Sequence, residues 1–184
     1  LFIGWMSNWQ YANATPTDPW RSAMTIPRSL EWIQEEGLHL LQSQPIEELK
    51  VLRDSKPLKV ENGQPIDIGT GTFELESNTP NHFTINLMNN KGEKTVIRIT
   101  PESLILDRSE AGISDFHQEF ARVLSAPLAE VVTEKIKVFV DHSSVEVFLN
   151  DGLVVMTARV FPREPYHIVE IKGADATIYP LRSS

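Results

Sequence analysis

Residues 135–162 carry the clearest alternation of hydrophobic and polar positions in the chain. In KIKVFV (135–140) and SVEVFL (144–149), apolar side chains recur at every second residue, a period that places successive side chains on opposite faces of a sheet. Asp141-His142-Ser143 and Asn150-Asp151-Gly152 interrupt these runs with residues that favour tight turns. The pattern predicts a meander of three antiparallel strands, the last within residues 153–161.

The same period recurs in short segments through much of the remaining sequence. We expect strands at residues 66–68 and 72–76 (one strand or two), 83–88, 95–99, 103–108, 167–172 and 176–181. Short strands separated by turn residues at intervals of about ten residues are typical of a β-sandwich. The sequence therefore predicts an all-β fold, a two-sheet antiparallel β-sandwich.

Three segments fit this alternation differently. Residues 37–45 are predicted to form a strand that stops at Pro45, and residues 46–53 have a spacing that predicts one short helix. Residues 109–134 are looser and are interrupted by Ala126-Pro127-Leu128. We expect a long loop or an edge excursion there.

Composition narrows the classes of partner. The net charge is −8 and the basic residues are dispersed without a run, which argues against binding to a nucleic-acid backbone. No apolar run approaches the ~18 residues that cross a bilayer, and no basic leader precedes an apolar segment. The chain has no cysteine, so disulfides and cysteine zinc sites are excluded. We expect no cofactor, no nucleic acid and no membrane as partners.

Residues 1–30 concentrate aromatic side chains. Trp5, Trp9, Trp20 and Tyr11 are interleaved with amides and Arg21, and flat aromatic faces beside amides suit sugar rings, whose C–H edges stack while their hydroxyls form hydrogen bonds. The alternative is that these aromatics are the packed core of two short strands. Composition alone leaves both interpretations open.

Specific motifs in this segment resemble a known family. GWMSNWQYA and PTDPWRSAMTIPR resemble the fifth and last propeller blade of glycoside hydrolase family 32, the group of levanases, exo-inulinases and invertases. RDSKPL, SSVEVFLNDG and RVFP follow in the order of that family's C-terminal β-sandwich. The resemblance implies the last strands of a five-bladed propeller at residues 1–30, a connector at 31–36 and the sandwich at 37–184.

The resemblance also implies a reaction and its residues. Family members hydrolyse β-fructofuranosidic bonds with retention, using two carboxyl groups from Asn-Asp-Pro and Glu-Cys motifs and a stabilising aspartate from Arg-Asp-Pro. None of these motifs occurs in this sequence. We therefore expect the catalytic residues to be encoded ahead of Leu1, and this stretch alone to be inactive. Trp5, Asn8 and Trp9 are the predicted substrate-binding residues.

Further partners follow from the same resemblance. The expected ones are a fructan or sucrose substrate in the intact enzyme, the enzyme's own propeller and a second copy of the chain. The implied location is extracellular, with a cytoplasmic one left open. Because a lone blade lacks neighbouring blades, residues 1–25 are expected to pack on the sandwich, on another chain or on an upstream part.

Other groups of polar residues are interpreted as structural. The Arg53-Asp54-Ser55 segment departs from Arg-Asp-Pro and lies in the sandwich portion, while Glu35-Glu36 and Glu47-Glu48 are expected at the solvated surface. The five histidines lack the spacing of metal ligands. Asp141 to Ser144 contains the letters of a triad, but neighbours on one turn cannot align as one.

Two other functions remain open. One is a stand-alone, lectin-like carbohydrate-binding sandwich, and the other is a pure interaction module. An upstream Asn-Asp-Pro aspartate distinguishes the hydrolase from both, and a lack of fructan binding distinguishes the interaction module.

Overall fold

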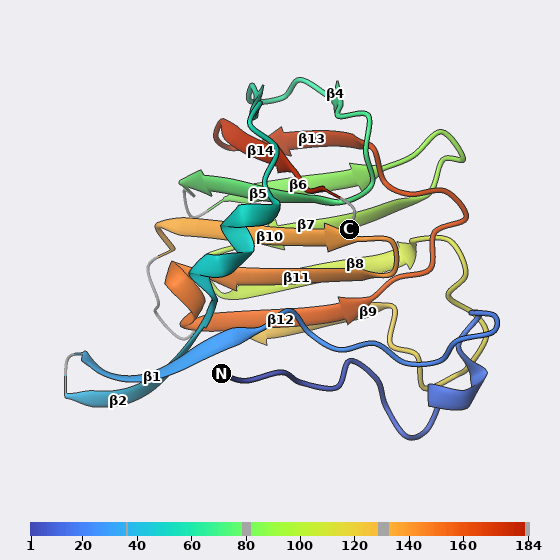
Figure 1. The fold of residues 1–184 in the computed structure, drawn as a ribbon, viewed down its shortest axis with the longest axis horizontal. Coiled ribbons are helices and arrows are strands. Elements are labelled where there is room, and N and C mark those ends of the chain that lie inside the picture. The colour runs from blue at the N-terminus through green and yellow to red at the C-terminus, as the bar shows by residue number, and fades with distance from the viewer. Residues whose placement is uncertain (36, 79–81, 129–132, 183–184) are drawn as a thin grey trace.

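The computed structural model shows a sandwich of two six-stranded antiparallel sheets (Figure 1). It describes residues 1–35, 37–78, 82–128 and 133–182. The predicted all-β, two-sheet antiparallel sandwich is confirmed, and the described helices are three short 3-10 turns, η1 (Ala12–Ala14), η2 (Glu47–Leu52) and η3 (Asn150–Gly152). None of them has the length or hydropathy needed to cross a membrane.

The first sheet contains the predicted meander at one edge. Its strand order is β12-β11-β10-β5-β14-β3. The bounds are β12 (Val154–Arg159), β11 (Ser144–Leu149), β10 (Lys135–Asp141), β5 (Phe73–Asn78), β14 (Ala176–Pro180) and β3 (Leu58–Val60). The turn at Asn150 and Asp151 has positive φ angles of 47° and 55°, a conformation that asparagine and aspartate tolerate.

The second sheet is built mainly from the middle of the chain. Its strand order is β4-β13-β6-β7-β8-β9. The bounds are β4 (Ile66–Asp67), β13 (Ile168–Lys172), β6 (Phe83–Met88), β7 (Lys94–Ile99), β8 (Ser103–Glu110) and β9 (Val123–Pro127). Residues 66–76, predicted as one strand or two, form two strands that belong to different sheets.

The core lies between the sheets and follows the predicted alternation. In β10, Ile136 and Val138 are buried in it, while Lys137 points to the opposite face with Glu74 of β5. β11 departs from simple alternation because five of its six residues are buried. Both of its faces are therefore covered, the inner one by the second sheet and the outer one by the N-terminal part of the chain.

Residues 1–45 lie along one side of the sandwich (Figure 1). β1 (Arg28–Glu35) and β2 (Leu38–Pro45) pair in an antiparallel ribbon that projects from the body. Isolated bridges join Phe2 to Arg28 and Trp5 to Met24. The first six residues thus run antiparallel to the segment that leads into β1, and η2 then crosses the outer face of the first sheet.

Several sequence predictions are refined by these elements. The predicted short helix is η2, and the strand at 37–45 is β2. Residues 31–35 of the predicted connector form the second half of β1, whereas Glu36 lies outside the described residues. The loose segment at 109–134 contains β9, which pairs with β8 at the edge of the second sheet. β3 was not predicted, because its three residues are too few to reveal a period.

Candidate functional site

Two of the three predicted substrate-binding residues, Asn8 and Trp9, lie on one exposed turn, and the third, Trp5, precedes this turn and is bridged to Met24. The Asn8 carbonyl accepts hydrogen bonds from the amides of Tyr11 (3.1 Å) and Ala12 (2.8 Å), and the Asn8 Oδ1 accepts one from the Gln10 amide at 2.9 Å. The rings of Trp5 and Trp9 are tilted against each other with centroids 5.0 Å apart. Trp9 is 88% exposed and Trp5 is 40% exposed, so this pair presents aromatic surface to solvent.

A hydrogen bond to Ser22 holds the side chain of Trp5. The indole Nε1 donates a hydrogen bond to the Ser22 hydroxyl, and Ser22 adopts a φ of 74°, in the left-handed region that L-residues other than asparagine and aspartate rarely occupy. The indole nitrogen is thereby satisfied while the ring face remains exposed.

A buried ion pair joins this N-terminal part to the sandwich. Arg28, the last residue of the TIPR motif, pairs with Glu146 of the SVEVF motif, and their side chains are only 8% and 2% exposed. The other Glu146 oxygen accepts a hydrogen bond from the Ile26 amide at 2.8 Å. Arg28 also donates to the Thr157 hydroxyl at 2.7 Å and lies over the Phe148 ring.

Burial sets the protonation behaviour of this pair. Desolvation raises the pKa of Glu146 above its usual range, and Arg28, the Ile26 amide and Thr157 act against that rise. A carboxylate in such a place depends on its cation, since an unpaired buried charge is strongly unfavourable. The sequence motifs that carry the family resemblance are thus in direct contact with each other across 118 residues of sequence.

The end of the same hairpin contacts the ribbon. Gly152 has a φ of 90°, and a Cβ atom placed on it would meet the backbone oxygen of Ser43 in β2 at 2.0 Å. Only glycine permits both the conformation and the approach. The hairpin motif SVEVFLNDG therefore holds the N-terminal part at two points, Glu146 and Gly152.

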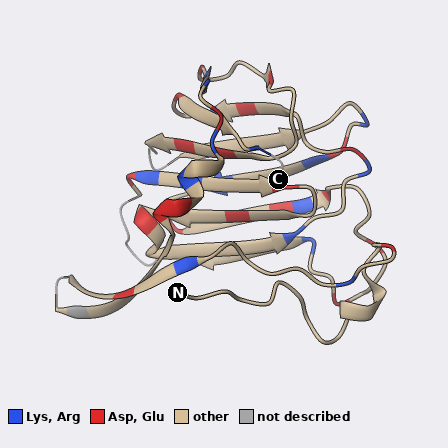
Figure 2. Ribbon diagram, in the orientation of Figure 1, with Lys and Arg blue, Asp and Glu red and all other residues tan. Residues whose placement is uncertain are grey.

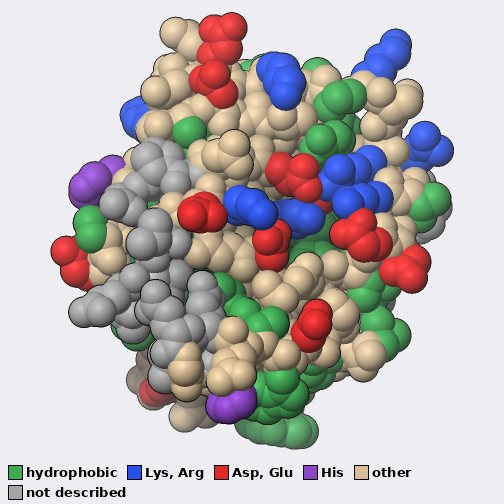
Figure 3. Space-filling view, turned by 90° about the vertical axis from the view of Figure 1, so that its left-hand side faces the viewer, with side chains coloured by type: hydrophobic (Ala, Val, Ile, Leu, Met, Phe, Trp, Pro, Cys, Tyr) green, Lys and Arg blue, Asp and Glu red, His purple; other side chains and the backbone are tan. Residues whose placement is uncertain are grey.

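The outer face of the first sheet carries a groove beside η2. Its volume is about 710 Å³, and it is lined largely by charged and polar side chains of β2, η2, β5, β10, η3 and β14. Figure 3, which views the molecule from the side at the left of Figure 1, shows basic and acidic side chains next to one another in a band. Over the whole described chain, the two signs are also dispersed rather than gathered in one basic block (Figure 2).

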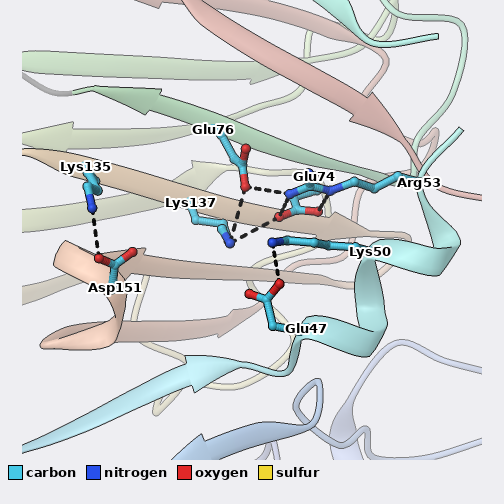
Figure 4. A network of polar contacts seen from close by, with 8 residues as sticks. All are labelled: Glu47, Lys50, Arg53, Glu74, Glu76, Lys135, Lys137 and Asp151. Carbon is cyan, nitrogen blue, oxygen red and sulfur yellow. Dashed lines mark hydrogen bonds and ion pairs between the residues drawn. The ribbon is translucent and has the colours of Figure 1, made fainter. Parts of the chain in front are cut away.

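Arg53 forms the centre of an ion-pair network that borders this groove and shares Glu76 and Lys137 with its lining (Figure 4). Its guanidinium donates to both oxygens of Glu74 at 2.7 Å, contacts Glu76 and stacks 3.9 Å from the Tyr179 ring. The hydrogen bonds that Arg53 donates to Glu74 raise the pKa of Arg53 above its usual value. Lys137 lies 3.3 Å from Glu76. These contacts give Arg53 the structural role that was predicted for the Arg53-Asp54-Ser55 segment.

The remaining titratable groups are dispersed. In the described part of the chain no group of three or more histidine, cysteine, aspartate or glutamate residues is arranged to hold a metal ion. Glu47 and Glu48 are exposed, as predicted, and Glu47 pairs with Lys50. The Glu36 side chain, with that of Glu35, lies outside what the structure describes. His142 contacts Asp141 on an exposed turn, without the alignment of a triad.

Comparisons with known proteins agree with this architecture. The sequence profile "Glycosyl hydrolases family 32 C terminal" matches residues 39–179, and the profile "Glycosyl hydrolases family 32 N-terminal domain" matches residues 1–45. The levanase of Bacillus subtilis (strain 168) is 33% identical over 99% of this chain. The extracellular exo-inulinase of Aspergillus awamori is 34% identical over 88% of it.

A solved structure supports the same relationship. The crystal structure of exo-inulinase from Aspergillus awamori superposes with a TM-score of 0.83, at 30% identity over 98% of this chain. The chain spans 30% of the length of the levanase, 34% of the exo-inulinase sequence and 40% of the exo-inulinase crystal chain.

The chain is an all-β protein whose sandwich packs against an aromatic N-terminal segment. The two profiles and the two relatives place it among the glycoside hydrolases. The chain belongs to glycosyl hydrolase family 32, and the predicted family membership is confirmed. The sequence analysis did not identify the residues that join the two matched parts, Arg28 and Glu146. Glu146 is the one charged residue of β11, and that contrast was the available signal, whereas Arg28 lies in a strand with two other charged residues and gave none.

Proposed function

We propose that this chain forms the C-terminal part of a retaining β-fructofuranosidase that acts on levan, inulin or sucrose. The observation that supports this most is the match of the N-terminal and C-terminal profiles in family order, residues 1–45 and then 39–179. Hydrolysis with retention requires a pair of carboxyl groups about 5 Å apart. Because the family's carboxylate motifs do not occur in the sequence, this chain's role is to brace the catalytic part and to form one rim of its pocket.

Trp5, Asn8 and Trp9 are the proposed contribution to that rim. Their support is geometric, since Trp9 and Asn8 are exposed neighbours on one turn and the Trp9 ring is tilted against the ring of Trp5. The furanose C–H groups would stack on the Trp9 face, and the free NH₂ of the Asn8 amide would donate to a hydroxyl.

The test is a Trp9→Ala variant of the intact enzyme, assayed by fructose release from levan, inulin and sucrose. Loss of a stacked aromatic contact is expected to raise KM about tenfold. Trp32→Ala is the matched control, because Trp32 is 71% exposed but lies on the β1–β2 ribbon. Unchanged kinetics in Trp9→Ala would refute the assignment of the rim, and fructose release by residues 1–184 alone would refute the division of roles.

The division into residues 1–30, 31–36 and 37–184 stays a prediction. β1 runs across residue 30, and the β1–β2 ribbon and the N-terminal profile both end at Pro45. These two observations favour an N-terminal part that continues to Pro45. Limited proteolysis of the intact enzyme, with cleavage mapped to residues 46–57 or to residues 31–36, separates the two boundaries.

A carbohydrate-binding module without hydrolytic activity is the second candidate, favoured by the exposed Trp5 and Trp9 rings. It predicts that residues 1–184 bind levan in calorimetry and that the gene encodes no upstream Asn-Asp-Pro motif. Secretion is proposed from the relatives, which include a protein named as an extracellular exo-inulinase, and is tested by locating activity in culture medium. Association with a second copy is tested by light scattering.

A further inference from the structure

Two buried arginines at the edge of the sandwich are held by carbonyls and aromatic rings. Arg108 of β8 and Arg159 of β12 are each 3% exposed. The Arg108 Nε donates to the Ala121 carbonyl at 2.8 Å, and one of its terminal nitrogens donates to the Arg159 carbonyl. Its guanidinium lies 3.6 Å from the Phe120 ring centroid. A lysine could not reproduce this planar, multiply bonded and stacked arrangement.

The N-terminal segment docks on this pair of arginines through Tyr11. The Tyr11 ring meets Phe120 edge to face at 5.4 Å and Phe116 at 6.1 Å. Its side chain also interacts with the Arg108 guanidinium. We call Tyr11, Phe116, Phe120, Phe161 and Arg108 the docking cluster. Phe161 completes it by contacting both other phenylalanines.

The docking cluster also gives a role to the loop after β8. Residues 111–122 were predicted as loose, yet Phe120 is only 3% exposed. Because Phe120 packs between Arg108 and Tyr11, this loop forms part of the surface that binds the N-terminal segment. Trp20 adds a second contact, because the Arg159 guanidinium lies 5.3 Å from its ring.

Tyr11 and Trp9 belong to the same turn, so the cluster determines where Trp9 points. The Tyr11 amide donates to the Asn8 carbonyl at 3.1 Å, and this bond closes the backbone turn from which both side chains project. Trp9 itself is 88% exposed, and its ring contacts that of Trp5. Its orientation therefore depends on the backbone of the turn and on its contact with Trp5.

We propose that Arg108 and Tyr11 are positioning residues, through which the sandwich holds the Trp5–Trp9 platform in place for a fructan chain. This inference rests on the proposed function of Trp5, Asn8 and Trp9. Neither residue touches the sugar. Each acts through the turn, by lowering the number of orientations that Trp9 samples before substrate arrives.

The test uses the intact enzyme and steady-state kinetics on levan. Arg108→Lys keeps the charge but loses the stacked guanidinium, and KM is expected to rise about fivefold while kcat stays unchanged. Tyr11→Phe keeps the ring contacts and is expected to show a smaller rise, whereas Tyr11→Ala should match or exceed Arg108→Lys. Arg98→Lys is the control, because Arg98 lies on the neighbouring strand β7 and is exposed.

A double variant separates positioning from a general structural effect. If Arg108 acts through the platform, adding Arg108→Lys to Trp9→Ala changes KM no further. A fivefold rise in that background, or a loss of kcat alone, would overturn the proposal. So would an unchanged KM in Arg108→Lys when Trp9→Ala alone raises it. An unchanged KM in Trp9→Ala itself would instead refute the proposed sugar site on which the inference rests.

Discussion

The Arg28–Glu146 pair offers the sharpest test of how the N-terminal part is attached. Replacing Arg28 by methionine leaves Glu146, which is 2% exposed, as a buried carboxylate without its cation. Removing one partner of a buried ion pair costs about 3–5 kcal/mol. This total includes about 1 kcal/mol for the lost hydrogen bond to Thr157 and about 0.5–1 kcal/mol for the lost contact with Phe148. We expect Arg28→Met to lose about 3–5 kcal/mol of unfolding free energy at pH 8.

The loss should depend on pH in a defined direction. Without Arg28, the pKa of Glu146, already raised by burial, rises further. When a group has a higher pKa in the folded than in the unfolded state, its contribution to stability is fully present below the pKa of the unfolded state. That contribution is lost as the pH rises through the pKa of the folded state. At pH 5 the carboxyl group is protonated to a greater extent, so the loss should shrink toward the 1–2 kcal/mol of the Thr157 and Phe148 contacts.

The assay is urea unfolding followed by two signals. All four tryptophans lie within residues 1–35, so tryptophan fluorescence reports the N-terminal part, whereas far-UV circular dichroism reports the sandwich strands. In Arg28→Met the fluorescence transition should precede the dichroism transition at pH 8. Arg28→Met/Glu146→Gln should recover most of the loss, because the amide still accepts from the Ile26 amide and carries no charge.

Two controls make this test decisive. Lys50→Met removes the exposed Lys50–Glu47 pair, whose side chains are 47% and 76% exposed, and should leave both transitions in place. Two results together would refute the reasoning: an equal loss of unfolding free energy in Arg28→Met at pH 5 and pH 8, and a double variant no more stable than Arg28→Met. They would show that Arg28 does not stabilise the protein by neutralising the buried charge of Glu146.

Two further predictions concern the turn after β11 and a buried glutamate. Gly152→Ala should destabilise the chain by about 2–3 kcal/mol, since the new methyl group meets the Ser43 oxygen. The control is Gly92→Ala, which measures the cost of the backbone conformation alone because Gly92 has a φ of 76° and nothing within 4 Å of an added Cβ atom. Equal losses of unfolding free energy in the two variants would exclude the clash. Burial acts to raise the pKa of Glu93, but hydrogen bonds from Asn89 and Arg163 lower it below 4.5. Its contribution to stability is therefore present above pH 4.5 and lost as pH falls through the lowered pKa. Glu93→Gln should destabilise at pH 7, and acid titration by circular dichroism should show this difference closing below pH 4.5.

The sequence predicted the sandwich well where a strand has one buried and one solvated face. β10 begins by alternating Lys135 and Lys137 with Ile136 and Val138, and the period is visible there because only the isoleucine and valine face the core. β9 escaped detection because it is an edge strand that ends at Pro127 and its residues are at most half-buried. Its position depends on pairing with β8, which no local pattern encodes.

The candidate site was predicted only in part, for a related reason. Trp5, Asn8 and Trp9 are close in sequence and were found together by motif and composition. Arg28, Glu146 and Arg108 act through contacts with residues far away in sequence, and a single sequence gives no measure of such pairs. The structural role of Arg53 was predicted from the absence of a proline, whereas its partners Glu74 and Glu76 required the paired strands to be seen.

The approach of Gly152 to Ser43, together with the Arg28–Glu146 pair, has a consequence for engineering. The sandwich and the N-terminal part meet at Gly152 and at the Arg28–Glu146 pair as well as at the docking cluster, so a chimera that exchanges the sandwich between relatives must transfer the complementary positions on both sides. Transferring the hairpin alone into a relative that lacks the matching arginine would bury the Glu146 carboxylate in the new interface without its cation.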